Sequence, residues 1–243
     1  MTTMIISDLH IPYEDKLAVN VALKIHQRMR PAMVIVNGDL LDFPQISHFT
    51  SDPANNQTLG DDINAGVAIL KKLQRYSKVV FLEGNHEIRM RNYILDNAPE
   101  LYEFLDLKTI FENKIDDLEY IQGVGKESMY YYDNDLLVGH FNKVSKHAGY
   151  TAKLLVDQYR CNVVQGHTHR VGVHFATGFN GTIAGYESGC LCSLEPQYIS
   201  KPNWQQAVLM YNTAVVDSQK ITNMEVVRIQ EGKALYRGKV YRG

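Results

Sequence analysis

Five short apolar runs in this chain end in side chains that can bind metal ions or move protons. In the clearest of them, residues 80–87, an apolar run stops at Gly84 and is followed at once by Asn85 and His86. The other four runs end in Asp8 and His10, Asp39, His140, and His167 and His169. Each run predicts a buried strand, and open α/β sheets place their ligands at the carboxyl ends of such strands. We therefore expect the five ends to converge on one site.

Carboxylate, amide and imidazole groups from separate segments are the ligand set of a centre with two divalent ions. Two ions about 3.5–4 Å apart activate a hydroxide between them and hold the oxygens of an in-line displacement. A carboxylate must lie between the ions to offset their repulsion, and Asp39, which follows Gly38, is the candidate bridge. The remaining ligands form two sets, each taking one histidine of the 167/169 pair: Asp8 with His10, and Asn85 with His140.

The ligand types also indicate the metal and the acid. Mixed oxygen and nitrogen ligands suit Mn²⁺, Fe, Zn²⁺ or Ni²⁺ better than Ca²⁺ or Mg²⁺, and we expect Mn²⁺ first.

His86 follows a ligand directly, so it can lie beside the ions while pointing elsewhere. A histidine with a pKa near neutrality can protonate a leaving alkoxide, which makes His86 the candidate catalytic residue. Asp42, Glu83 or Glu87 would orient His86 or brace a metal ligand.

Three further side chains are candidates for substrate contacts. Arg89 and Arg170 stand beside the motifs, where a guanidinium can hold a phosphate through two parallel hydrogen bonds. His48 lies in a polar loop that follows the second run. We expect substrate choice to depend on the loops 43–60, 97–134 and 186–204.

The rest of the pattern predicts an α/β fold in one domain, residues 1–243. The expected strands cover residues 3–7, 33–36, 78–82, 135–139 and 161–165, and the expected helices residues 15–30, 61–76, 87–96 and 146–160. Residues 97–134 are the least regular part and should end in a β-hairpin. Short β segments after His169 predict a second, mostly antiparallel sheet that packs on the first.

Composition excludes several classes of protein. Of the 243 residues, 45% are hydrophobic and 21% charged, as in an ordinary globular protein. The net charge of −2 gives no broad attraction for nucleic acid. We expect reduced thiols at the three cysteines, because their odd number and spacing predict neither a disulfide framework nor a zinc knuckle. With no signal-peptide pattern and no apolar run of about 20 residues, we expect no membrane association and a cytoplasmic enzyme.

In their order and residue types, the five motifs resemble the signature blocks of the calcineurin-like metallophosphoesterase superfamily, and the chain is similar to its compact phage and bacterial members. The blocks are Asp8-Leu9-His10, Gly38-Asp39, Gly84-Asn85-His86-Glu87, Gly139-His140 and Gly166-His167-Thr168-His169. The resemblance implies a four-layer α/β/β/α sandwich of two mixed sheets flanked by helices. It also implies that His86 is the catalytic histidine and that Asp39 belongs to both ligand sets. The implied sets are Asp8, His10, Asp39 and His169 on the first ion, and Asp39, Asn85, His140 and His167 on the second.

Two departures narrow the choice within this superfamily. Its protein phosphatases carry a GDxVDRG block, whereas this chain has Gly38-Asp39-Leu40-Leu41-Asp42-Phe43. Its lipid A pathway members have arginine where His86 stands. We therefore disfavour both.

The leading hypothesis is a binuclear metal-dependent phosphoester hydrolase with a hydroxide between the ions as nucleophile. It would act as a phosphodiesterase or phosphatase on a nucleotide-type or other small phosphoester. One alternative is a DNA or RNA nuclease of the same superfamily, whose basic, aromatic groove would use residues 130–132, Lys143 and Lys146. The other alternative, of another class, is a catalytically silent binding scaffold.

Overall fold

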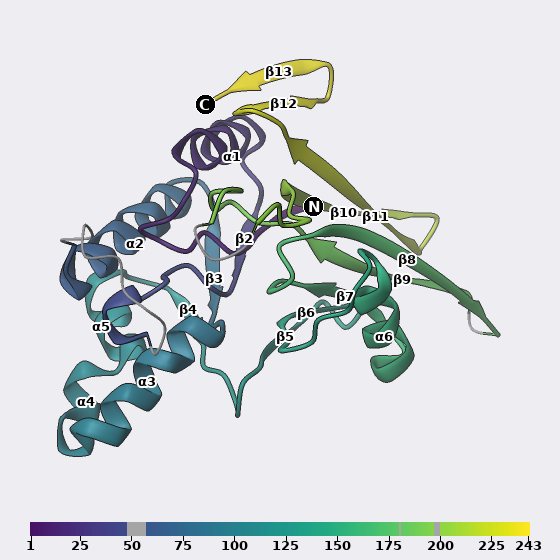
Figure 1. Cartoon of the computed structure of the whole chain (residues 1–243). Helices are drawn as coiled ribbons and strands as arrows, with labels where there is room; N and C mark the ends of the chain where they lie inside the picture. Colours follow the sequence, from purple (N-terminus) through teal and green to yellow (C-terminus); the bar gives the residue numbers. More distant parts are fainter. Residues whose placement is uncertain (48–56, 180, 197–199) are drawn as a thin grey trace.

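Two β-sheets form the centre of the molecule (Figure 1), a computed structural model that describes residues 1–47, 57–179, 181–196 and 200–243. The first sheet has six strands in the order β11-β10-β1-β2-β3-β4. Strands β1 to β4 run parallel, and the long β10–β11 hairpin joins β1 antiparallel. Its strands are β1 (Thr2–Ile6), β2 (Met33–Asn37), β3 (Lys78–Leu82), β4 (Glu119–Ile121), β10 (Gln206–Val216) and β11 (Gln219–Ile229).

The second sheet has five strands in the order β5-β6-β7-β9-β8. Its three central strands are parallel, and the two edge strands pair with them antiparallel. The strands are β5 (Ser128–Tyr132), β6 (Leu136–His140), β7 (Asn162–Gln165), β8 (Val171–Gly178) and β9 (Gly181–Ser188). A small hairpin near the C-terminus, β12 (Lys233–Tyr236) and β13 (Lys239–Arg242), lies against the first helix.

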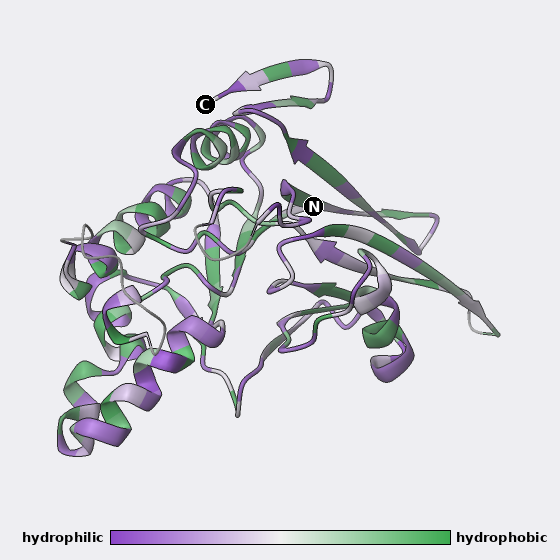
Figure 2. Cartoon of the chain, in the orientation of Figure 1, coloured by the Kyte–Doolittle hydropathy of each residue, from purple (hydrophilic) through white to green (hydrophobic). Residues whose placement is uncertain are grey.

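Helices cover the outer face of each sheet, which gives four layers. Apolar residues of α1, α2, α3 and α5 pack on the outer face of the first sheet, and those of α6 pack on the second. A third apolar cluster fills the space between the sheets, with Ile35 and Val80 facing Val138 and Val164. Strands β2 and β3 are mostly apolar in Figure 2, whereas the helices alternate between apolar and polar residues. The helices are α1 (Lys16–Met29), α2 (Leu59–Gln74), α3 (Asn85–Asn97), α4 (Tyr102–Leu105), α5 (Leu107–Lys114) and α6 (Tyr150–Tyr159), with 3-10 turns η1 (Pro44–Ile46) and η2 (Pro99–Leu101).

Local signals explain where the helices next to the site begin. The Asp15 carboxylate accepts hydrogen bonds from the backbone of Leu17 and Ala18, which caps α1. Thr58 and Asp61 form a reciprocal capping box at the start of α2. Helix α3 begins at Asn85, immediately after β3, so the polar motif forms its first turn.

The four-layer sandwich is confirmed, but the assignment of strands to sheets was wrong in part. Strands β6 and β7 belong to the second sheet, while β10 and β11 extend the first. The second sheet is mixed and not mostly antiparallel. A short apolar strand covered on both faces has the same sequence pattern in either sheet, so the pattern could not distinguish them. The expected irregular segment 97–134 contains α4, α5 and β4 before the β5–β6 hairpin.

The tyrosine run in β5 does not form the aromatic face suggested for a nuclease. Side chains on a strand alternate between its faces. Tyr131 is therefore 64% exposed, whereas Tyr132 is buried between the sheets and accepts a hydrogen bond from Thr3.

Three expectations are not decided by the fold. The single domain over residues 1–243 and the cytoplasmic location stay predictions. His48 lies outside the described residues. Among the described helices, none is long and apolar enough to cross a membrane.

Candidate metal centre

The five strand ends meet where the carboxyl edges of the two sheets face each other. Strands β1, β2 and β3 contribute from the first sheet, and β6 and β7 from the second. Each of three overlapping groups offers ligand atoms that lie within 4.8 Å of one another. The groups are Asp8 with His10 and His169, His10 with Asp39 and His86, and Asp39 with His140 and His167. The cluster could therefore hold metal ions.

Asp39 lies at the centre of this cluster. Its Oδ2 atom is 3.2 Å from Nε2 of His140 and 3.6 Å from Nε2 of His10. The amide oxygen of Asn85 is 3.3 Å from the same His140 nitrogen. On the other side, Oδ1 of Asp8 is 3.3 Å from Nε2 of His169. One carboxylate thus reaches both halves of the predicted ligand set.

Three histidines are held with Nε2 toward the cluster and Nδ1 away from it. Nδ1 of His140 donates to the Asn37 carbonyl at 2.8 Å, and Nδ1 of His10 lies 2.8 Å from the Asp42 carboxylate. Nδ1 of His169 lies 3.6 Å from the thiol of Cys192. Metal-binding histidines have this arrangement, because a partner on one nitrogen fixes the tautomer that leaves the other free for the ion. The donor set therefore fits a divalent metal.

The charges of the cluster favour cations. Burial alone would raise the pKa of Asp39, but the neighbouring histidines, His140 foremost, lower it well below its usual value. Burial opposes protonation of His140 and His169, yet Asp39 and Asp8 raise their pKa values to about 9. Burial and the nearby His140 lower the pKa of His167 to about 4. Burial likewise opposes protonation of His10, but the Asp42 carboxylate raises its pKa well above the usual value. In the metal-free chain, protons on these three histidines thus offset part of the carboxylate charge, and metal ions would replace them.

The backbone at these positions adopts an uncommon conformation. Five of the seven predicted ligands have positive φ angles: Asp8, His10, Asp39, His167 and His169. A positive φ is rare outside glycine and costs of order 1–3 kcal/mol per residue, and such residues cluster at functional sites. Gly38, which precedes Asp39, also has a positive φ, of +78°.

Position 84, just after β3, requires glycine because the chain passes very close to Asp39 there. A Cβ atom at this position would overlap the backbone nitrogen and carboxylate of Asp39. The buried Glu87 carboxylate then accepts hydrogen bonds from the backbone of Gly84, Asp39 and Leu41. Glu87 therefore joins the loops that follow β2 and β3, and it does not orient His86.

Asp42 is the carboxylate that orients His86. Its Oδ1 atom lies 3.1 Å from Nδ1 of His86 and 2.8 Å from Nδ1 of His10. The Asp42 carbonyl also accepts from Nδ1 of His86 at 2.9 Å. Nε2 of His86 consequently faces the cluster, 4.0 Å from Asp39. One side chain thus orients both a predicted ligand and the predicted acid.

We expect Asp42→Asn to lower metal affinity or kcat/KM by about 10–100-fold, the usual cost of losing a partner that orients a ligand. The substitution keeps the shape of the side chain and removes its charge. Metal titration and steady-state kinetics would measure the change. The exposed Asp116→Asn is the matched control. Equal values for the two variants would show that Asp42 does not orient these histidines.

The two arginines that we predicted to contact the substrate have different surroundings. Arg89 lies at the site, with one guanidinium nitrogen 3.2 Å from the Asp42 carbonyl and the other 3.5 Å from Nε2 of His86. Arg170 donates to the Ser145 carbonyl and holds the segment that follows β6. The substrate-binding roles of both arginines stay predictions.

Arg91, two residues after Arg89, is part of a buried ion pair. Its guanidinium lies 2.9 Å from the carboxylate of Glu83, which is fully buried. The same carboxylate accepts hydrogen bonds from the Tyr120 hydroxyl and the Gly123 backbone. Glu83 thereby ties α3 to the segment after β4.

Arg91→Met should lower the free energy of unfolding by about 3 kcal/mol, because the Glu83 carboxylate would stay buried without its cation. Denaturant unfolding would measure the change. The exposed Arg28→Met, at the end of α1, should shift it by less than about 0.5 kcal/mol. A stable Arg91→Met variant would contradict this account of the pair.

Sequence reasoning missed three side chains around the cluster. Asn37 donates to the Gly139 carbonyl and so joins β2 to β6 across the two sheets. Cys192 was treated only as a reduced thiol, yet it contacts His169. Trp204 packs its ring on His169, with ring centroids 4.3 Å apart. Only Asn37 could have been noticed beforehand, because it directly precedes the Gly38-Asp39 motif.

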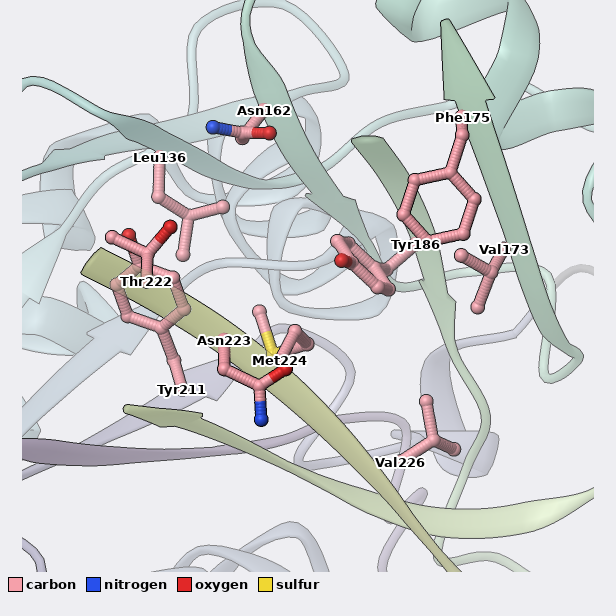
Figure 3. Close-up of a pocket in the computed structure, with 10 residues that line it drawn as sticks. All are labelled: Leu136, Asn162, Val173, Phe175, Tyr186, Tyr211, Thr222, Asn223, Met224 and Val226. Carbon is pink, nitrogen blue, oxygen red and sulfur yellow. The ribbon is translucent and has the colours of Figure 1, made fainter. Parts of the chain in front are cut away.

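A separate cavity of about 340 Å³ lies between the sheets, away from the cluster. Figure 3 shows it lined by residues of β8 to β11 such as Phe175, Tyr186, Tyr211 and Met224. None of its ten lining residues is a carboxylate, histidine or cysteine. This cavity therefore offers none of the side chains that make up the cluster.

Comparison with known proteins identifies the family of this chain. The family model described as calcineurin-like phosphoesterase matches residues 1–178, and the chain belongs to this family, as the five motifs predicted. It is 27% identical to the Gene 54 protein of Mycobacterium phage D29 and 26% identical to that of phage L5, and in each case the match covers 98% of this chain and 97% of the relative.

Solved structures with a similar arrangement include two proteins of low sequence identity. A single mutant of Vps29 from Entamoeba histolytica is 15% identical with a TM-score of 0.40, covering 93% of this chain and 99% of that one. YfcE, a phosphoesterase from E. coli, is 14% identical with a TM-score of 0.39, covering 93% and 98%.

Proposed function

We propose that this chain hydrolyses small phosphoesters with two divalent metal ions held at the shared edge of its sheets. The observation that carries the proposal is the position of Asp39, whose carboxylate lies within 3.6 Å of imidazole nitrogens from both halves of the cluster. Family membership supports metal-dependent phosphoester hydrolysis. The expected substrates are nucleotide-type or other small diesters and monoesters, and Mn²⁺ is the ion to test first.

The proposed ligands divide around Asp39. Asp8, His10 and His169 would hold one ion, and Asn85, His140 and His167 the other, with Asp39 shared. When bound, the two ions would supply an activated hydroxide and offset the charge of the phosphoryl oxygens.

The chain's own groups would position the substrate and move the proton. His86 would donate a proton from Nε2 to the leaving oxygen, because Asp42 occupies its Nδ1. Arg89, beside His86, would hold a phosphoryl oxygen. Asp42 would keep both His10 and His86 in orientation.

An assay with Mn²⁺ and two aryl phosphates tests the proposal. We expect hydrolysis of a bis-aryl phosphate, a mono-aryl phosphate or both, and loss of that activity on chelation of the metal. Binding of two ions without hydrolysis of either compound would favour the silent scaffold. Degradation of single-stranded DNA or RNA with a steep salt dependence of binding would favour the nuclease.

A further inference from the structure

Four aromatic rings form a row along one side of the cluster. His86 packs edge-on against His10 with ring centroids 4.7 Å apart, and His10 contacts His169 at the same spacing. Trp204, the only tryptophan in the chain, continues the row at 4.3 Å from His169. His86, the predicted acid, thus lies at one end of the row and contacts His10. Trp204 lies at the other end and contacts His169, a predicted ligand.

Neighbouring residues hold Trp204 in this place. The Gln205 backbone donates to the His169 carbonyl at 2.9 Å, and its side chain accepts from the backbone of Val171. The Gln206 side chain donates to the carboxylate of Asp15 at 2.8 Å and to the Cys192 carbonyl at 2.9 Å. These bonds hold the segment that carries Trp204 beside His169 and Cys192.

Packing in the core does not account for this tryptophan. Trp204 is half-buried and is part of none of the three apolar clusters, as far as the described residues go. A hollow of about 370 Å³ lies on the segments before it, lined by Leu194, Pro196 and Pro202 together with Glu195 and Lys201. The indole therefore contacts a predicted ligand, and residues shortly before it in the chain line a hollow with an apolar wall, one carboxylate and one cation.

The ends of the row suggest where the two substituents of a phosphodiester would lie. His86 would protonate the leaving oxygen, so the leaving group belongs at its end of the row. The substituent that stays on phosphorus would then extend toward Trp204. An indole beside a phosphate site is suited to stack a planar base or aryl ring, because every such ring has a π-face.

We propose that Trp204 is the specificity-determining residue that stacks the aromatic substituent retained on phosphorus, so that the substrates of this site are phosphodiesters of a nucleoside or similar aromatic group. This inference rests on the proposed function. It adds to it the class of substrate and the side chain that selects it.

Two diesters with the same leaving group test the inference. Bis(4-nitrophenyl) phosphate retains an aryl group after cleavage, whereas methyl 4-nitrophenyl phosphate retains a methyl group. In the wild type we expect a higher kcat/KM for the aryl compound. Trp204→Leu should lower the ratio of the two kcat/KM values by roughly tenfold or more, as expected for loss of a stacked ring. Trp204→Phe should restore most of it.

Metal content and a matched variant separate this effect from damage to the site. Trp204→Leu should bind as much Mn²⁺ as the wild type. Phe104→Leu removes another aromatic side chain, which is 74% exposed on α4, and should leave the ratio unchanged. An unchanged ratio in Trp204→Leu, with both compounds still hydrolysed, would overturn the inference and leave the proposed function standing.

Fluorescence tests the inference if the wild type hydrolyses neither of these diesters. The proposed function is refuted only if a mono-aryl phosphate is not hydrolysed either. Trp204 is the single tryptophan, so its emission reports on this place alone. In the Mn²⁺-loaded protein, adenosine 5′-monophosphate should quench it and ribose 5-phosphate should not. Equal quenching by the two compounds, or none by either, would overturn the proposal that Trp204 stacks an aromatic group, independently of the kinetic test.

Discussion

Asp39→Asn should abolish the binding of two ions and remove nearly all turnover. The substitution keeps the size of the side chain but removes the charge that lies between His140 and His10. Two cations at the spacing of a binuclear site repel each other, and the shared carboxylate is the group that offsets this repulsion. We expect kcat/KM to fall by more than about 100-fold, beyond the usual cost of losing a partner outside the ligands.

Metal analysis and kinetics on the same preparation would measure both effects. The control is Asp96→Asn, an exposed carboxylate near the end of α3, which should bind metal and turn over like the wild type. Full turnover by Asp39→Asn, with two ions still bound, would show that the cluster needs no shared carboxylate.

His86→Ala should lower turnover while leaving the metal content unchanged. Nε2 of His86 faces the cluster at 4.0 Å from Asp39, and Nδ1 is held by Asp42. Loss of a general acid typically costs about 10²–10⁴-fold. The loss should be large for a diester with an alkoxide leaving group and much smaller for one with 4-nitrophenolate, because that leaving group needs no proton.

The dependence on the leaving group distinguishes proton donation from damage to the site. His147→Ala, which removes an exposed histidine before α6, is the matched control. If His86→Ala slowed both classes of diester equally, or left both unchanged, His86 would not be the acid.

The sequence was sufficient to predict which residues meet, because the carboxyl ends of buried strands converge in an α/β fold. Asp8, His10 and Asp39 follow directly after such strands, and the structure brings them together. It did not reveal that β6 and β7 lie in the other sheet, since a strand covered on both faces has the same pattern in either sheet.

Contacts between distant segments account for what sequence reasoning could not predict. Asp42, Glu83 and Glu87 were equal candidates for orienting His86, and only geometry separates them. Trp204 reaches His169 through the pairing of its own segment with the loop that contains Cys190, which no motif records. The positive φ angles of Asp8, His10 and His169 have no signal in the sequence, because among the five ligands with such angles a glycine directly precedes only Asp39 and His167.

Anomalous diffraction from crystals grown with Mn²⁺ tests the central claim most directly. We predict two anomalous peaks about 3.5–4 Å apart, both in contact with the carboxylate of Asp39. One peak should also contact His10 and the other His140. A single peak, or two peaks that Asp39 does not join, would contradict the two-metal account.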